Sequence, residues 1–389
     1  MKPSDDFSFY LDPIDEEVAE LSIKQRGNAP FRPIDIHTPG RLPDIDEADL
    51  VIVGIDERNA DGSMICAPDE IRKKLYSLHL PDAGLKIADL GNIKQGATAK
   101  DTQVALQYVI SGLALHRTMA VVIGGRQDLT FAIYAAYEIL ESTVNLAIAD
   151  ARVDMGEFRE ELSEENYLSK IVIHKPSYLF NLSVLGYQNY LNDPETLLLM
   201  DKLYFDTVRL GEVKSDPRCM EPHLRQADIL SVDTGSIKNA DGPGSFQPNG
   251  FTGEEICRLA RYAGLGDKCS TLGIFNYNPD HDPARQTAML IAQIVWHAAE
   301  GLGNRIKEYP LMNKPDFLEY KVQMPEGSEH ITFFKSKRTD KWWMNVPYAE
   351  GDTGRPVRHH LIPCNYNDYE LAASGEVPDL WWRTYRKLT

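Results

Sequence analysis

Short apolar runs, many of them rich in β-branched residues, recur along the chain from residue 49 onward. Their apolar residues occupy successive rather than alternate positions, which is typical of strands covered on both faces of a sheet. The runs are DLVIVGI (49–55), KIADLG (86–91), MAVVIGG (119–125), NLAIAD (145–150), YLFNLSVLGY (178–187), ADILSVDT (227–234) and CSTLGIFN (269–276).

Helix signals lie between these runs. Thr252 followed by Glu255 is a capping-box pattern, which predicts that a helix begins at this point. Farther along, Asp282 and Pro283 predict a helix start and Gly303 its end. Alternating strands and helices predict a three-layer α/β/α fold with a mainly parallel sheet. In such sheets, functional groups gather at the carboxyl ends of the strands.

The pattern divides the chain into three parts. Residues 1–45 are rich in Asp, Glu and Pro without a sustained period, which predicts an arm that lies on the main body. Residues 46–308 form the predicted α/β domain. Residues 309–389 predict a β-containing extension with turns at Pro325–Gly327 and Lys337–Asp340. The extension contains four of the five tryptophans, so we expect it to pack on the main domain or to form an interface.

The net charge of the chain limits the classes of partner that it is expected to bind. The formal net charge of −17 repels phosphate backbones and anionic lipid surfaces, so we expect neither nucleic acid nor a membrane as a partner. The N-terminus has no signal-peptide pattern and no 18-residue apolar run occurs, which predicts a cytoplasmic location. The five cysteines form no CxxC pair, so they suggest neither a disulfide framework nor a thiolate zinc site.

Three of the predicted strands end in polar motifs: GGRQD (124–128), DARVD (150–154) and SVDTG (231–235). In this order they resemble the GG(G/D)H, DAHxD and SxDxD elements of the ureohydrolase family, which includes arginase, agmatinase and formimidoylglutamase. The family's E-x-N-P motif has its counterpart in NYNPDHD (276–282). The resemblance covers roughly residues 45–308 and implies an arginase-like fold.

Members of that family bind two manganese ions through six side chains and attack a guanidino or formimino carbon with a bridging hydroxide. When the six ligand positions of the family are matched to this sequence, three ligands are retained and three are replaced. The six positions are Gln127, Asp150, Arg152, Asp154, Asp233 and Gly235. The glutamate that anchors the substrate's cationic group in the family is Asn276 here.

The replacements differ in consequence. Gln127 retains a carbonyl oxygen, which binds manganese more weakly than imidazole does, and Gly235 has no side chain to offer. Arg152 carries a permanent positive charge that cannot coordinate a metal. Three carboxylates within ~5 Å of one another repel by about 3 kcal/mol per pair at an effective dielectric constant near 20, so they need a cation or raised pKa values. We predict that Arg152, together with Arg126, supplies this cation in place of the metal pair.

The leading interpretation is therefore a catalytically inactive ureohydrolase homologue that keeps the fold for interaction, assembly or ligand sensing and needs no cofactor. The alternative is a metal-dependent hydrolase of linear C–N bonds, nearest to formimidoylglutamase or arginase, with a reduced site. In that case Asp150, Asp154 and Asp233, with Gln127 and Asp128 in support, would hold Mn²⁺ or Mg²⁺. In both interpretations the extension is a candidate for binding a protein partner or for self-association.

Other motifs have simpler interpretations. His174 lies in a stretch where some ureohydrolases carry a catalytic histidine, but a loop or strand-end role is preferred because the match is poor. His281 and the pair His359–His360 have no partner at metal-site spacing, so we interpret them as surface or capping residues. The loop 241–250 is predicted to line the mouth of a pocket.

Overall fold

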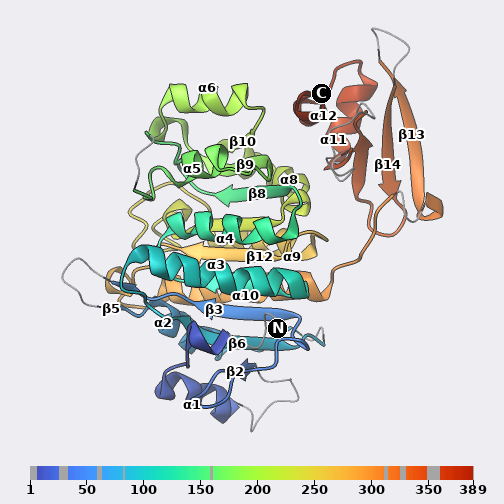
Figure 1. The fold of residues 1–389 in the computed structure, drawn as a ribbon. Coiled ribbons are helices and arrows are strands. Elements are labelled where there is room, and N and C mark those ends of the chain that lie inside the picture. The colour runs from blue at the N-terminus through green and yellow to red at the C-terminus, as the bar shows by residue number, and fades with distance from the viewer. Residues whose placement is uncertain are drawn as a thin grey trace.

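A ten-stranded sheet with helices on both faces forms the centre of the molecule (Figure 1). This computed structural model describes residues 7–25, 34–58, 64–81, 84–157, 161–310, 314–324, 330–347 and 360–388. The strands lie in the order β1-β6-β3-β7-β12-β11-β8-β9-β10, and β2 also pairs with β6. Every pairing is parallel except that of β1 with β6. The predicted mainly parallel α/β/α fold is confirmed.

Most strands of this sheet coincide with the apolar runs of the sequence, and the residues in their middles are buried. In chain order they are β1 (Leu11–Asp12), β2 (Asp35–Ile36), β3 (Leu50–Gly54), β6 (Ile87–Ile93), β7 (Met119–Ile123), β8 (Val144–Ala149), β9 (Leu179–Tyr187), β10 (Asp206–Arg209), β11 (Ile229–Asp233) and β12 (Thr271–Phe275). The two short strands β4 (Glu57–Arg58) and β5 (Met64–Ile65) form a separate pair.

The two faces of the sheet bury separate hydrophobic layers because successive side chains of a strand point in opposite directions. In β3, Leu50 and Ile52 join one layer, whereas Val51 and Val53 join the other. The first layer includes side chains from α1 (Glu16–Gln25), α2 (Ala67–Leu75), α7 (Leu210–Ser215), α8 (Glu221–Gln226), α9 (Gly253–Leu265) and α10 (Gln286–Gly303). The second includes α3 (Ala99–His116), α4 (Thr130–Ala136), α5 (Tyr167–Ile173) and α6 (Pro194–Lys202).

The helix signals of the sequence are only partly reproduced. The capping box is confirmed, because Glu255 N donates to Thr252 Oγ1 at 3.2 Å and Thr252 N donates to Glu255 Oε2 at 2.8 Å. The next predicted helix start is wrong: α10 begins at Gln286, because the preceding residue Arg285 has a left-handed backbone with a φ of 57°. Asp282 nevertheless accepts a hydrogen bond from the backbone of Gln286 at 2.8 Å. No helix in the described ranges is long and apolar enough to cross a membrane.

The N-terminal arm completes one edge of the sheet. Leu11 of β1 pairs with Ile93 of β6 in antiparallel register, and β2 pairs with the same strand in parallel register. Phe7 and Leu11 are both at most 2% exposed and belong to the second hydrophobic layer. The arm therefore shares the core of the main domain.

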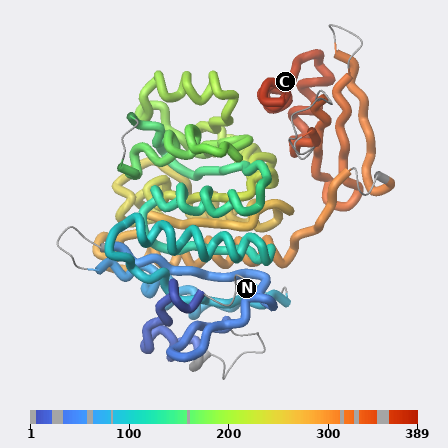
Figure 2. The backbone as a smooth tube through the Cα atoms, in the orientation of Figure 1, coloured from blue at the N-terminus to red at the C-terminus, as the bar shows by residue number. Residues whose placement is uncertain are grey.

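The C-terminal extension is a four-stranded antiparallel sheet with two helices, set to one side of the main body (Figures 1 and 2). Its elements are β13 (Phe317–Gln323), β14 (His330–Ser336), β15 (Trp342–Asn345), β16 (Leu361–Cys364), α11 (Tyr366–Ala373) and α12 (Asp379–Leu388). It has its own hydrophobic cluster, which includes Phe333, Met344 and Trp381. Residues 337–339 form a turn between β14 and β15, as predicted, whereas the predicted turn at 325–327 lies outside the described residues.

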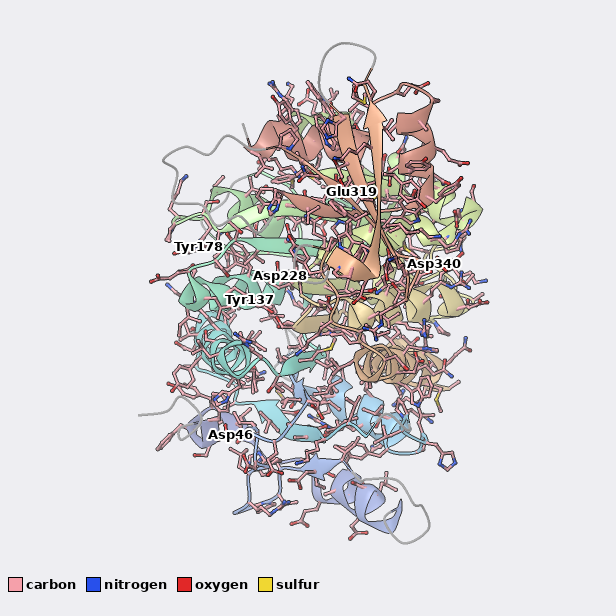
Figure 3. All side chains as sticks on the ribbon, turned by 90° about the vertical axis from the view of Figure 1, so that its right-hand side faces the viewer. Asp46, Tyr137, Tyr178, Asp228, Glu319 and Asp340 are labelled. Atoms are coloured by element: carbon pink, nitrogen blue, oxygen red, sulfur yellow. The ribbon has the colours of Figure 1, made fainter. Side chains whose placement is uncertain are left out.

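Arg225 of α8 joins the extension to the main domain. Its side chain is buried, and Nη2 donates to the carbonyl oxygens of Trp342 at 2.9 Å and Cys364 at 3.1 Å. Its guanidinium carbon also lies 4.4 Å from the centre of the Trp343 ring. In Figure 3 the extension, marked by Glu319 and Asp340, faces the viewer in front of the central sheet.

We expect Arg225→Ala to lower the free energy of unfolding by about 1–3 kcal/mol, because two buried carbonyl oxygens lose their donor. Urea denaturation followed by tryptophan fluorescence measures this loss. The matched control is Arg218→Ala, since Arg218 is a solvent-exposed arginine whose ion pair is with Asp216, and it should leave the curve unchanged. Equal unfolding midpoints for the two variants would contradict the role of Arg225.

Candidate functional site

The candidate site lies where β7, β12, β11 and β8 end side by side at the carboxyl edge of the sheet. After β7 the chain turns through Gly124 and Gly125, which have φ values of 85° and 74°. A Cβ atom at Gly124 would lie 2.5 Å from the carbonyl oxygen of Ile55. Only glycine suits this turn, which places Arg126, Gln127 and Asp128 beside the ends of the neighbouring strands.

Three carboxyl groups converge at this edge: Asp150 after β8, Asp154 four residues farther on, and Asp233 at the end of β11. The pKa of Asp150 is raised well above its usual value by burial and by the negative charges of Asp233 and Asp154. Burial of the carboxyl group and the charge of Asp233 raise the pKa of Asp154 to about 7. Burial likewise raises the pKa of Asp233 to about 6. The structure thus brings together the three acidic residues selected from the sequence.

Asp233 is held by hydrogen bonds from within its own chain. Its Oδ1 accepts from the backbone of Gly235 at 2.8 Å and from Nδ2 of Asn276 at 3.0 Å. The Oδ1 of Asn276 in turn accepts from the backbone of Gln127 at 3.0 Å, so one amide joins the ends of β7, β11 and β12. A Cβ atom at Gly235 would lie only 2.7 Å from Asp233 Oδ2. The carboxylate therefore turns toward the position at which the family has another ligand.

Two buried polar atoms at the cluster have no hydrogen-bond partner among the described residues: Asp150 Oδ2 and the hydroxyl of Tyr167. The other oxygen of Asp150 accepts from the backbone of Arg152 at 2.9 Å. Burial and the negative charge of Asp154 raise the pKa of Tyr167 well above its usual value. Tyr167 belongs to α5 and was missed in the sequence because no motif surrounds it. Asp150 and Asp154 can still share a proton, because a side-chain hydrogen bond between them contributes to both pKa values.

Arg152 does not take the predicted place. Its side chain is exposed and forms no ion pair within 4.0 Å with any of the three carboxylates, all of which are described residues. Its positive charge still lowers the pKa values of Asp154 and Asp233 from a distance. The guanidinium therefore lies outside the cluster, and it is the backbone of Arg152 that contacts Asp150.

Gln127 is buried, with 1% of its surface exposed, but its side chain points to a neighbouring hydroxyl pair. Its Nε2 lies 3.5 Å from Ser231 Oγ, which shares a 2.8 Å hydrogen bond with Thr130 Oγ1. No hydrogen bond joins the Gln127 side chain to the three carboxylates, all in the described part of the chain. Gln127 is thus part of the packing between β7 and β11.

Arg126 lies at the rim and forms ion pairs with Asp128 at 3.3 Å and with Glu164 at 3.6 Å. Burial raises the pKa of Asp128 to about 6. Both residues line a cavity of about 760 Å³ that extends toward Asp56 and the start of α3. Glu164, which raises the pKa values of Asp154 and Asp233, was also missed in the sequence because it lies in a loop without a motif.

The histidines considered in the sequence lie apart from the cluster. His174 ends α5, where its ring contacts the Glu138 carboxylate and lies edge-on to Phe131, with 5.4 Å between ring centres. His281 packs edge-on against Phe246. The carbonyl of His360 accepts from the backbone of Val346 at 2.7 Å, and His359 lies outside the described residues.

The residues at this edge do not fit the two-metal centre that the resemblance implies. Of the two histidine positions, one holds Gln127, which bonds elsewhere, and the other holds the exposed cation Arg152. Gly235 offers no ligand, and Asp233 Oδ1 already accepts two hydrogen bonds. Among the residues that the structure describes, no group of three or more His, Cys, Asp or Glu side chains is arranged to hold a metal ion.

Comparison with known sequences finds curated relatives that share one name. The formimidoylglutamase of Vibrio cholerae serotype O1 is 25% identical over 274 residues, which cover 62% of this chain and 79% of the relative. The formimidoylglutamase of Macrococcus caseolyticus is 25% identical over 240 residues, or 59% of this chain and 76% of the relative. No protein-family model matches the sequence.

Solved structures agree in fold. Formiminoglutamase from Trypanosoma cruzi, crystallised with Mn²⁺, superposes with a TM-score of 0.60 at 18% identity and covers 68% of this chain and all of its own. Formimidoylglutamase from Bacillus subtilis has a TM-score of 0.58 at 14% identity and covers 73% of this chain and 99% of its own. This chain therefore resembles formimidoylglutamases in sequence, and it has the fold that these solved structures share.

Proposed function

We propose that this chain is a catalytically inactive member of the ureohydrolase family, which keeps the fold for interaction, assembly or ligand sensing. One observation carries the proposal: Asp233, a retained ligand position, is bound by Gly235 and Asn276 of its own chain. Because Oδ1 already accepts from two donors, a metal ion at this position would be left with Oδ2 as its main ligand atom. The neighbouring positions supply no replacement ligand.

The charge distribution supports this proposal. A dication binds where ligands are deprotonated and no fixed positive charge is near. At this edge, the pKa values of Asp154 and Asp233 are raised to about 7 and about 6, and the charge of Arg152 acts on both. The charge of Arg152 lowers both pKa values, so it stabilises the two carboxylates without a metal ion and disfavours a dication beside them.

A second candidate is a hydrolase of linear C–N bonds with a reduced metal site, acting on guanidino or formimino compounds. It is favoured by the name of the curated relatives and by the unpartnered Asp150 Oδ2 and Tyr167 hydroxyl. In that case Asp150, Asp154 and Asp233 would hold one hard divalent ion, Mn²⁺ or Mg²⁺, through oxygen atoms alone. The comparisons favour this candidate, whereas the donor set of the site favours the inactive protein.

Metal content separates the two candidates. After incubation with Mn²⁺ and desalting, we expect no bound manganese by plasma mass spectrometry and no release of urea, ammonia or formamide from guanidino and formimino substrates. The triple variant Gln127→His, Arg152→His, Gly235→Asp should gain manganese, because it restores the three missing ligands. Two manganese ions bound to the natural chain would contradict the proposal of an inactive protein. One bound ion together with hydrolysis of a substrate would establish the second candidate.

Asn276→Asp tests the network around Asp233. The substitution keeps the acceptor for the backbone of Gln127 but replaces the donor to Asp233 with a second carboxylate, so we expect a loss of about 1–3 kcal/mol in the free energy of unfolding at neutral pH. Asn278→Asp is the matched control, because the Asn278 side chain accepts from the backbone of Asp280 at 2.9 Å and donates to no other described residue. If the two variants unfold at the same urea concentration, the stabilising role of Asn276 beside Asp233 is contradicted.

The C-terminal extension is the proposed contact surface for a protein partner or for a second copy of the chain. Two of its aromatic side chains are exposed, Tyr366 by 51% and Trp382 by 46%, and they lie on α11 and α12. Large exposed aromatic rings are enriched at protein interfaces.

Sedimentation velocity tests self-association. If a second copy binds here, the full chain should dimerise with rising concentration, and Trp382→Ser should abolish this because it removes a large apolar contact. Phe9→Ser is the control, since Phe9 is 71% exposed but lies in the N-terminal arm. A chain that stays monomeric at high micromolar concentration excludes self-association and leaves the partner protein as the occupant.

A further inference from the structure

A second cavity, of about 320 Å³, opens at the carboxyl ends of β9 and β10. We infer that it binds a small anion bearing a carboxylate or phosphate group. Tyr187 and Arg209, which pair in register across the ends of these two strands, form part of its wall. Lys214 of α7 and Lys238 of the loop after β11 complete a set of three cationic side chains. Among the residues that the structure describes, no aspartate or glutamate lines the cavity.

The charge of this lining is opposite to that of the chain. Because the formal net charge is −17, the surface as a whole repels anions. A concave site whose described lining holds cations and neutral groups has a focused positive potential, so it attracts anions locally. Its volume is at the lower end of the range for small-molecule sites, which favours a compact ligand.

The two lysines are positioned by carboxylates outside the cavity. Lys214 Nζ lies 2.5 Å from Glu255 Oε2, and Lys238 Nζ lies 3.4 Å from Asp241 Oδ1. Both carboxylates also accept backbone hydrogen bonds at the start of α9, from Thr252 and from Gly253 respectively, each at 2.8 Å. The acids are therefore fixed at the helix start, where they partly balance and orient the lysines.

Arg209 is the cation left for a ligand. It is exposed, and no carboxylate of the described residues lies within ion-pair distance of its guanidinium. A planar guanidinium donates two parallel hydrogen bonds to a carboxylate or a phosphate, which gives both affinity and orientation. An unpaired arginine in the same cavity wall as two anchored lysines suits an incoming anion.

Amide and phenol groups supply the neutral part of the site. Gln188 Nε2 donates to the carbonyl oxygen of Asn249 at 3.3 Å, which ties the end of β9 to the loop that we predicted to line a pocket mouth. The hydroxyl of Tyr190 donates to Gln188 Oε1. None of the carboxylates of the candidate site lines this cavity, so the inference is independent of the proposed function.

Calorimetric titration of the full chain at low salt tests the inference, with L-glutamate and inorganic phosphate as separate probes. We expect at least one of them to bind, and Arg209→Ala to weaken the binding by about tenfold or more. Lys202→Ala is the matched control, because Lys202 is exposed on α6 and absent from the lining; it should leave the dissociation constant unchanged. Which probe binds identifies a carboxylate or a phosphate ligand.

Gly211→Leu provides a test that changes no charge. Gly211 lines the cavity, and a Cβ atom added there would meet no heavy atom within 4 Å. The fold should therefore tolerate a leucine at this position, with a melting temperature that stays the same or rises because leucine favours a helix more than glycine does. Because Gly211 is part of the cavity wall, we expect the added side chain to reduce the space for a ligand and to weaken binding. The inference is overturned if neither probe binds up to about 10 mM. It is also overturned if the control weakens binding as much as Arg209→Ala, or if Gly211→Leu binds normally.

Discussion

Four adjacent parallel strands end at one edge of the sheet, and every polar group placed there must find a partner, a proton or a ligand. At the amino edge this requirement is met by Asp228, which accepts from the backbone of Asn145 at 2.8 Å and whose carbonyl lies 3.4 Å from the Tyr137 hydroxyl (Figure 3). At the carboxyl edge the crowding of Asp150 and Asp233 is answered by raised pKa values instead. The carboxyl groups with raised pKa values therefore gather at the carboxyl edge of the sheet.

The residues at the positions of ureohydrolase ligands stabilise this edge of the sheet in other ways. Gly235 leaves room for the Asp233 carboxylate to turn back onto the backbone, and Asn276 adds a second donor from β12. Arg152 remains in solvent because burying a guanidinium without close pairing costs several kcal/mol, whereas its exposed charge still acts on Asp154. The acidic cluster is thus held by hydrogen bonds and protons.

Properties that depend on local pattern were predictable from the sequence. The buried runs at residues 145–150 and 227–234 became the adjacent parallel strands β8 and β11, so the meeting of Asp150 and Asp233 followed from parallel topology. Properties that depend on tertiary contacts were not predictable from the sequence. The orientation of Arg152 depends on the cost of its burial, Tyr167 enters from a helix that no motif connects to the strand ends, and α10 starts late because Arg285 adopts a left-handed backbone and pairs with Glu70 at 2.6 Å.

The carboxyl edge is finally divided by charge. Its centre, at β8 and β11, concentrates acidic groups, whereas the cavity at the ends of β9 and β10 is lined by Arg209, Lys214 and Lys238. These cations do not neutralise the acids, because each is fixed on its own element: Arg209 at the end of β10, Lys214 by Glu255, and Lys238 by Asp241. A rigid sheet keeps the two groups apart. An anion is repelled by the centre and attracted to the end, so we expect the acidic cluster and the cavity to differ in the ligands that they select.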